Sequence, residues 1–193
     1  EYVLIPEYEP AGDVLATDAL YEVAVNEEEG RLTQLPVLWH DSRRFAQDRN
    51  GNETAPKQEA LQQRIRTPFL DYGSMSREPA AWTLRAGETV RFSVTAQAQA
   101  VTVSGLTLCI LREAEDIMEK EPGDVPLIVI EGESYSLKSD SYIRSGSVRN
   151  SALYPYDTYK KRVNVLDGST WGSVGQKVIW EFEVEEEGDY RIA

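Results

Sequence analysis

Aromatic side chains gather in one loop-rich stretch of the sequence, together with polar groups that could bind a ligand. The group consists of Tyr154, Tyr156, Tyr159, Asn150 and Asp157. Flat aromatic faces can stack on the C–H groups of sugars, while amides and carboxylates hydrogen-bond to sugar hydroxyls. We therefore predict a sugar-binding surface here. The alternative is that these amphipathic rings cover the ends of a β-sandwich.

Two tryptophans extend this prediction. Trp171 lies in the sequence Asp-Gly-Ser-Thr-Trp-Gly, whose small residues would leave the indole accessible to a sugar. Trp39 begins a second candidate site for an acidic or hydroxylated ligand. The residues that would complete the second site are His40, Asp41, Arg43, Arg44 and Arg49. A single histidine beside a tryptophan is also typical of ordinary packing, so this alternative stays open.

Catalytic and cofactor motifs are missing from the sequence. It has one cysteine, one histidine and no Gly-x-Ser-x-Gly elbow for a nucleophilic serine. No phosphate-binding loop or dinucleotide fingerprint occurs. The 33 acidic residues include no pair whose setting marks it for glycoside hydrolysis. We expect a protein that is not an enzyme.

The charge balance restricts the partners. The 193 residues include 20 Lys+Arg and 33 Asp+Glu, which gives a net charge of −13. An acidic chain without a basic stripe does not neutralise phosphates, so we expect no nucleic acid partner. No apolar run approaches the roughly 20 residues of a membrane-spanning helix, so we also expect no membrane insertion. A single cysteine excludes a disulfide within the chain.

Alternating apolar residues, the pattern of half-buried strands, dominate the rest of the chain. They predict strands near residues 21–25, 101–108 and 163–165, with a bulge at Gly105 where the alternation slips phase. They also predict a hairpin from Trp82 to Val94 and another from Val178 to Ile192. The residues expected in the core of these hairpins are Trp82, Phe92, Trp180 and Phe182.

Other segments are shorter. The apolar run 127–130 predicts a strand buried on both faces, and residues 57–66 and 111–120 predict two short helices. Two prolines and a glycine follow the second helix. We therefore divide the chain into residues 1–110, a helix and linker at 111–126, and residues 127–193. The whole predicts an all-β, antiparallel β-sandwich.

Two sets of motifs carry a family resemblance. Residues 130–135 read Ile-Glu-Gly-Glu-Ser-Tyr, and residues 175–190 combine Gly-Gln, alternating aromatics and Gly-Asp-Tyr. These resemble the opening half of galactose-binding-like, jelly-roll carbohydrate-binding modules. Residues 39–58 and 70–90 resemble the closing half. The chain is similar to such modules in large extracellular proteins linked to bacterial ABC-transporter sugar uptake.

The resemblance implies a non-catalytic, extracellular or cell-surface module of a bacterial glycan-capture or sugar-uptake system, akin to solute-binding proteins. Its partners would be a poly- or oligosaccharide and other domains of a larger protein. The resemblance also implies a structural calcium ion at Glu131 and Glu133, with Glu113 or Glu115 completing the ligands. The alternative is a structural spacer or interaction domain that binds no sugar.

The halves stand in reversed order, because the closing half comes first. Either the chain is a piece cut across two tandem modules, or it forms one circularly permuted sandwich. A half-sandwich alone would expose apolar surface and bare strand edges. We therefore expect residues 127–193 to cover the apolar side of residues 20–110, within one chain or by exchange between two chains.

Overall fold

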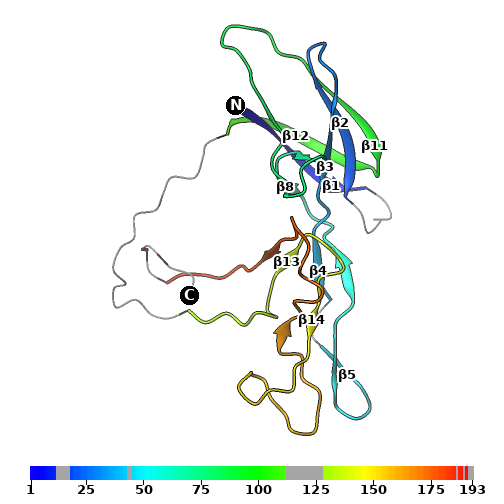
Figure 1. Ribbon diagram of the computed structural model, residues 1–193, viewed down its shortest axis with the longest axis vertical. Coiled ribbons are helices and arrows are strands. Elements are labelled where there is room, and N and C mark those ends of the chain that lie inside the picture. The colour runs from blue at the N-terminus through cyan, green and yellow to red at the C-terminus, as the bar shows by residue number, and fades with distance from the viewer. Residues whose placement is uncertain (12–17, 43–44, 112–127, 186, 189, 191–193) are drawn as a thin grey trace.

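The computed structural model describes residues 1–11, 18–42, 45–111, 128–185, 187–188 and 190 (Figure 1). Within these residues all regular elements are β-strands and every pairing is antiparallel, as predicted. The described part of the chain therefore has no helix that could cross a membrane. The strands are β1 (Tyr2–Pro10), β2 (Ala19–Val25), β3 (Arg31–Leu35), β4 (Trp39–Asp41), β5 (Ala46–Gln47), β6 (Glu53–Thr54), β7 (Gln58–Ala60), β8 (Ile65–Arg66), β9 (Leu70–Asp71), β10 (Ala81–Trp82), β11 (Phe92–Ala98), β12 (Val101–Ile110), β13 (Leu137–Lys138), β14 (Ser145–Gly146), β15 (Val165–Leu166) and β16 (Val178–Ile179).

Two four-stranded sheets form a β-sandwich in the upper part of Figure 1. One has the order β10-β1-β12, with β8 also pairing with β1, and the other has the order β11-β2-β3-β9. The apolar core between them draws on both sheets. Its buried side chains are Leu4, Tyr8, Ala19, Tyr21, Val23, Val25, Leu35, Ile65, Phe69, Ala80 and Trp82.

Strand β2 shows how the sequence sets this core. Its buried positions alternate with more exposed ones, so that Tyr21, Val23 and Val25 all face inward, as the sequence predicts. The polar Thr33 is also wholly buried in the neighbouring strand β3. Its hydroxyl donates a hydrogen bond of 2.9 Å to the carbonyl oxygen of Tyr21, which satisfies the buried group.

The bulge predicted at Gly105 is present. The register of β12 against β1 shifts between Glu7 and Tyr8, which pair with Gly105 and Val103 and leave Ser104 extra. An inserted residue of this kind reverses the phase of the alternation along the strand. The sequence signal and the structural irregularity therefore coincide.

The hairpin predicted from Trp82 to Val94 is wrong. Strand β10 pairs with β1, whereas β11 pairs with β2 in the opposite sheet. The rings of Trp82 and Phe92 meet edge to face across the sandwich, with centroids 5.8 Å apart. Both residues pack in or against the core as predicted, but the connection crosses between the sheets instead of folding back within one.

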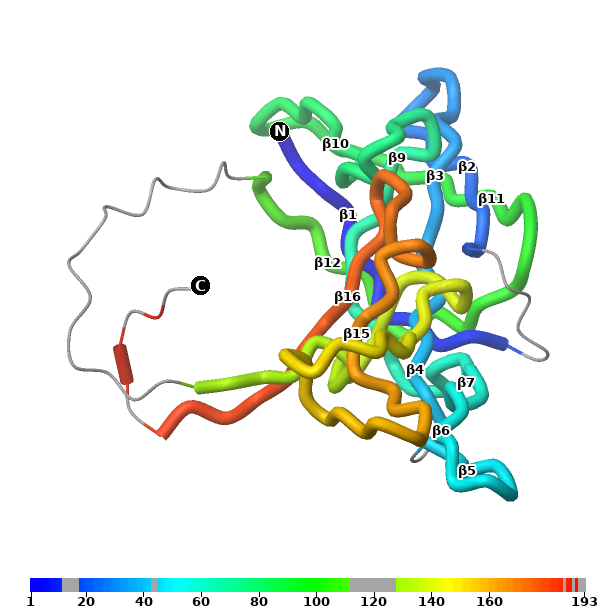
Figure 2. The backbone as a smooth tube through the Cα atoms, turned by 60° about the horizontal axis from the view of Figure 1, so that its bottom comes forward, coloured from blue at the N-terminus to red at the C-terminus, as the bar shows by residue number. Residues whose placement is uncertain are grey.

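A second region lies below the sandwich in Figure 1, with β4 to β7 near the bottom of Figure 2. It contains a sheet of order β16-β13-β4-β7 and the pairs β14–β15 and β5–β6. The predicted helix at 57–66 is wrong, because this segment forms β7 and β8. The amide of Leu61 donates to the carbonyl of Leu38 instead of to a helical turn. From the predicted helix at 111–120, residues 112–120 lie outside the described residues.

Two predictions near the C-terminal end are also wrong. Residues 128–130 form no strand, and Val129 is 71% exposed. Strand β16 ends at Ile179, so the predicted hairpin from Val178 does not form within the described residues. Its partner β13 is only two residues long, so Phe182 has no sheet to pack on and is exposed, while Trp180 is half-buried. Ile192 lies outside the described part.

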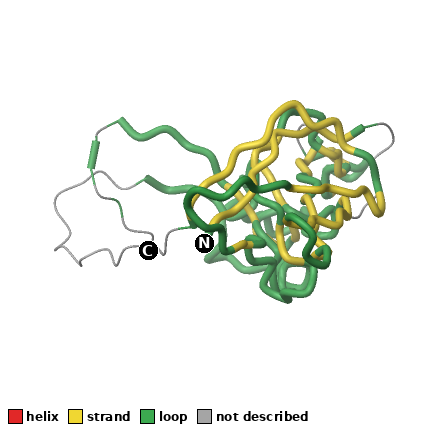
Figure 3. Tube along the Cα trace, turned by 90° about the horizontal axis from the view of Figure 1, so that it is seen from above, coloured by secondary structure: helices red, strands yellow, loops and turns green. Residues whose placement is uncertain are grey.

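Coverage of the sandwich by residues 127–193 differs from the prediction. Strands β13 and β16 join β4, so the later residues extend the second region. The apolar residues of β12, including Leu106 and Ile110, remain exposed in the structure as described. Figure 3 shows the strands gathered in one body, with loop segments extending away from it.

Candidate functional site

Residues from five chain segments line an open cavity of about 570 Å³. It brings together Trp171 and Tyr154 from the predicted sugar site and Glu131 and Glu133 from the predicted calcium site. The complete lining is Glu131, Gly132, Glu133, Ala152, Leu153, Tyr154, Asn164, Val165, Leu166, Trp171 and Trp180. The sequence predicts these two groups separately, and the fold places them around one space.

Asn164 holds the loop that carries Tyr154, Tyr156 and Tyr159, here called the tyrosine loop, beside this cavity. Strands β14 and β15 pair at the base of the loop, and Asn164 lies next to β15 with 5% of its surface exposed. Its amide donates to the carbonyls of Val148 (3.1 Å) and Pro155 (3.0 Å), and its Oδ1 accepts from the Val148 amide (2.9 Å). These bonds replace the missing strand ladder and fix Tyr154 at the cavity wall.

The indole of Trp171 is positioned by a tight turn and by a second indole. The Trp171 amide donates to the carbonyl of Asp167, and the Asp167 carboxylate accepts from the amide and hydroxyl of Ser169. The rings of Trp171 and Trp180 meet edge to face, with centroids 6.2 Å apart. Because Trp171 is 38% exposed, part of its ring is open to the cavity.

The two carboxylates give the cavity its negative charge. Burial raises the pKa of Glu133, and the charge of Glu131 acts in the same direction. Ca²⁺ takes six to eight oxygen ligands. The described residues contain no group of three acidic, histidine or cysteine side chains around this point, and Glu113 and Glu115 lie outside them. The described residues supply only two carboxylates at this point, and calcium binding stays a prediction from the sequence.

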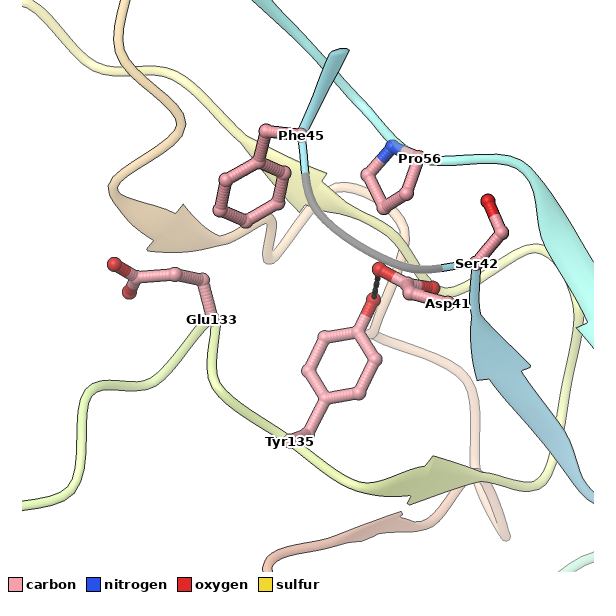
Figure 4. A pocket seen from close by; sticks show the side chains of 6 residues that line it. All are labelled: Asp41, Ser42, Phe45, Pro56, Glu133 and Tyr135. Carbon is pink, nitrogen blue, oxygen red and sulfur yellow. Dashed lines mark hydrogen bonds between the residues drawn. The ribbon is translucent and has the colours of Figure 1, made fainter.

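A smaller cavity of about 130 Å³ adjoins the first, since Glu133 lines both. Figure 4 shows its walls, where the ring of Tyr135 points toward Asp41. The Tyr135 hydroxyl donates a hydrogen bond of 2.8 Å to Oδ2 of Asp41. The remaining lining residues are Ser42, Phe45 and Pro56. This hydrogen bond joins residues 94 positions apart in the sequence.

A buried lysine lies behind Tyr135. The side chain of Lys138 is wholly buried, and its Nζ donates to Oδ1 of Asp41 (2.7 Å) and to the carbonyl of Ile143 (2.6 Å). Nζ also lies 3.2 Å from the Tyr135 hydroxyl. Burial lowers the pKa of Lys138, and the ion pair with Asp41 opposes this shift. This cluster is not visible in the sequence, because Leu-Lys-Ser-Asp at residues 137–140 is typical of an ordinary polar turn.

Other predicted sugar-binding residues lie away from the cavity lining. Tyr156 and Tyr159 are exposed at 43% and 87%. The carboxylate of Asp157 accepts from the Tyr159 and Lys160 amides and pairs with Arg162 at 3.0 Å. Asn150 accepts from the amide of Ala152. Asp157 and Asn150 therefore shape the loop, and the rings of Tyr156 and Tyr159 are exposed outside the cavity lining.

The second predicted site is spread out. Trp39 is half-buried in β4, where it pairs with Lys138 and with Ala60. Arg49 is exposed in the turn between β5 and β6, and Nδ1 of His40 lies 3.3 Å from the carbonyl of Asp41. Neither Trp39 nor Arg49 lines the two cavities. Arg43 and Arg44 lie outside the described residues.

Comparison of the chain with family models, curated proteins and solved structures finds no match.

Proposed function

We propose that the protein is a non-catalytic carbohydrate-binding module, and that the larger cavity is its sugar site. The observation that carries this proposal is the meeting of Trp171, Tyr154 and Trp180 with two carboxylates around one open space. Aromatic rings supply stacking faces, and carboxylates accept hydrogen bonds from hydroxyl groups. The carboxylates Glu131 and Glu133 would repel an anionic glycan, so a neutral oligo- or polysaccharide fits best.

The cellular setting follows from the family resemblance of the motifs. We place the protein outside the bacterial cell or on its surface, in a glycan-capture or sugar-uptake system that includes an ABC transporter. A single shallow site of this kind binds weakly, so neighbouring domains of a larger protein would raise the effective concentration. No turnover of glycosides or esters is expected.

Affinity electrophoresis through gels that contain neutral polysaccharides tests the proposal. The Trp171→Ala variant should lose retention, because it removes the exposed stacking face. Its contact with Trp180 contributes about 1 kcal/mol, so the melting temperature should fall by only a few degrees. The matched control is Tyr72→Ala, which removes a 52% exposed ring that does not line the cavity and should leave retention unchanged.

Retention of wild type and Trp171→Ala to the same extent would contradict the proposed site. Lack of retention on every polysaccharide would overturn sugar binding altogether.

The second candidate function is that of a spacer or interaction domain that binds no sugar, and one observation favours it. The apolar side chains of β12 are exposed in the sandwich, which is typical of a surface that binds protein.

A further inference from the structure

The strands β11 and β12 form an uncharged surface on a highly charged protein. The nineteen residues from Phe92 to Ile110 include no Asp, Glu, Lys, Arg or His. Elsewhere the chain is dense in charge, with 20 Lys+Arg and 33 Asp+Glu in 193 residues. We call residues 92–110 the uncharged edge.

Both strands of the uncharged edge lie at the margins of their sheets. Among the described residues β12 pairs only with β1, and β11 pairs only with β2. Each therefore presents a row of backbone groups without a strand partner in this part of the chain. Proteins usually guard such edges with lysine, proline or inward-pointing charges. The uncharged edge has none of these, although β12 is ten residues long.

Beyond Val101, which packs against the core, the inner face of β12 is also uncovered. Residues directly opposite each other in antiparallel strands point to the same face of the sheet. Leu108 pairs with the core residue Leu4, and Val103 pairs with the core residue Tyr8. These β12 side chains therefore face the core side of the sheet, beyond the cover of the opposing sheet. Their exposed fractions are 46% for Val103, 57% for Leu106, 45% for Leu108 and 58% for Ile110.

Strand β11 repeats this arrangement in the other sheet. Val94 pairs with the wholly buried Val23, so it too faces the core side, yet it is 40% exposed. The sandwich is thus open along the side where β11 and β12 meet. A hydrophobic interior that is open at one side is completed most simply by a strand from another molecule.

We infer that the occupant is a second copy of this chain, paired along β12 in antiparallel fashion about a two-fold axis. Two molecules of net charge −13 repel each other, and the residues of the uncharged edge add no like charge of their own to that repulsion. Antiparallel pairing of identical edges is self-complementary and closes at two copies. In this dimer the apolar side chains of one copy pack against those of the other, namely Leu106, Leu108 and Ile110. The unpaired backbone groups of the two β12 strands hydrogen-bond to each other. This inference does not depend on the proposed sugar site.

Ionic strength should strengthen this dimer. The remaining charges of the two molecules repel, and salt screens charges more than about 8 Å apart at 0.15 M. The apolar contacts and strand hydrogen bonds at the uncharged edge are far less sensitive to salt. The dissociation constant measured by sedimentation equilibrium should therefore fall as the NaCl concentration rises from about 0.02 M to about 0.5 M, because the Debye length shortens over this range.

The decisive experiment compares wild type with Leu106→Lys and Leu108→Lys by sedimentation equilibrium at 0.15 M salt. A lysine on the edge adds a charge that must be buried on pairing, so each variant should weaken the dimer at least about tenfold. Two variants are used so that one misfolded protein does not decide the test, and near-ultraviolet circular dichroism checks the fold. The matched control is Val174→Lys, at a 63% exposed valine outside the uncharged edge, and it should remain dimeric.

Three results would overturn the inference. The first is a wild-type protein that stays monomeric at all concentrations and salt conditions. The second is a dimer that persists unchanged in both folded lysine variants. The third is a dimer that Phe182→Lys abolishes while the β12 variants keep it, because exchange of the segment around the exposed Phe182 would then hold the copies together.

Discussion

The β-sandwich and the region around β4 and β13 differ in what their interiors contain. The sandwich buries aliphatic and aromatic side chains from long strands with alternating sequences. The second region has strands of two or three residues and is joined by polar side chains such as Lys138, Asp41 and Asn164. Where strands are too short to bury apolar area, side-chain hydrogen bonds to the backbone set the path of the chain.

The largest test of this contrast is Lys138→Ala. Removal of the buried ammonium leaves the Asp41 carboxylate without its ion-pair partner, and loss of one member of a buried pair costs about 3–5 kcal/mol. The free energy of unfolding, measured with urea, should fall by that amount. Hydrogen exchange should accelerate in β4 and β13 while β2 stays protected.

Lys57→Ala serves as the control, because Lys57 is exposed and its replacement should change the free energy of unfolding little. If hydrogen exchange in Lys138→Ala rises equally in both regions, the molecule unfolds as a single cooperative unit. The distinction between the two regions would then concern composition alone.

Asn164→Ala should have an intermediate effect. The variant loses three hydrogen bonds to the backbone of the tyrosine loop, and buried groups left without partners cost about 1–3 kcal/mol. We expect a lower melting temperature and weaker sugar retention, because Tyr154 loses its support. Asn150→Ala, at an exposed position with one hydrogen bond to the loop, is the milder comparison. Equal effects of both substitutions would show that burial does not distinguish these residues.

The smallest expected effect is that of Glu133→Gln. Burial raises the pKa of Glu133, so the folded protein binds this proton more tightly than the unfolded chain does. The resulting stabilisation is present below the ordinary pKa and is lost as pH rises through the raised one. At neutral pH the neutral amide should therefore stabilise the protein, by less than about 1 kcal/mol because the side chain is partly exposed.

Thermal melts of wild type and Glu133→Gln from about pH 4 to 8 measure this effect. The difference should shrink toward the acid end, where the wild-type carboxyl is protonated. Glu59→Gln is the control at an exposed carboxylate. A variant that is less stable than wild type at neutral pH would show that the Glu133 charge has a favourable partner instead.

Sequence alternation predicts the inward faces of strands better than their partners. It identifies the buried positions of β2 and the bulge in β12, because both are recorded in the local order of residues. It fails for the hairpin predicted from Trp82 to Val94, since Trp82 and Phe92 face the core whichever sheet their strands join. The pairing depends on contacts with β1 and β2, which lie far away in the sequence.

The site shows the same limit. Exposed aromatics among small and polar residues are visible in the sequence, and Trp171 and Tyr154 do line one cavity. The cluster of Lys138 with Asp41 leaves no local trace, because its partners are 97 residues apart. The alternating neighbours of Phe182 predict a core position, yet its ring is exposed, because alternation indicates a face only where a neighbouring strand continues.

The sheet β16-β13-β4-β7 takes two strands from before residue 111 and two from after residue 128. The sequence predicts a linker between these points, but one sheet includes strands from both sides of it. A truncated polypeptide that ends there would carry an unpaired Asp41 and a bare β4 edge, and the remaining piece would carry an orphaned ammonium. When the two pieces are mixed, the Lys138–Asp41 ion pair and the pairing of β13 with β4 should make them associate without a peptide bond between them.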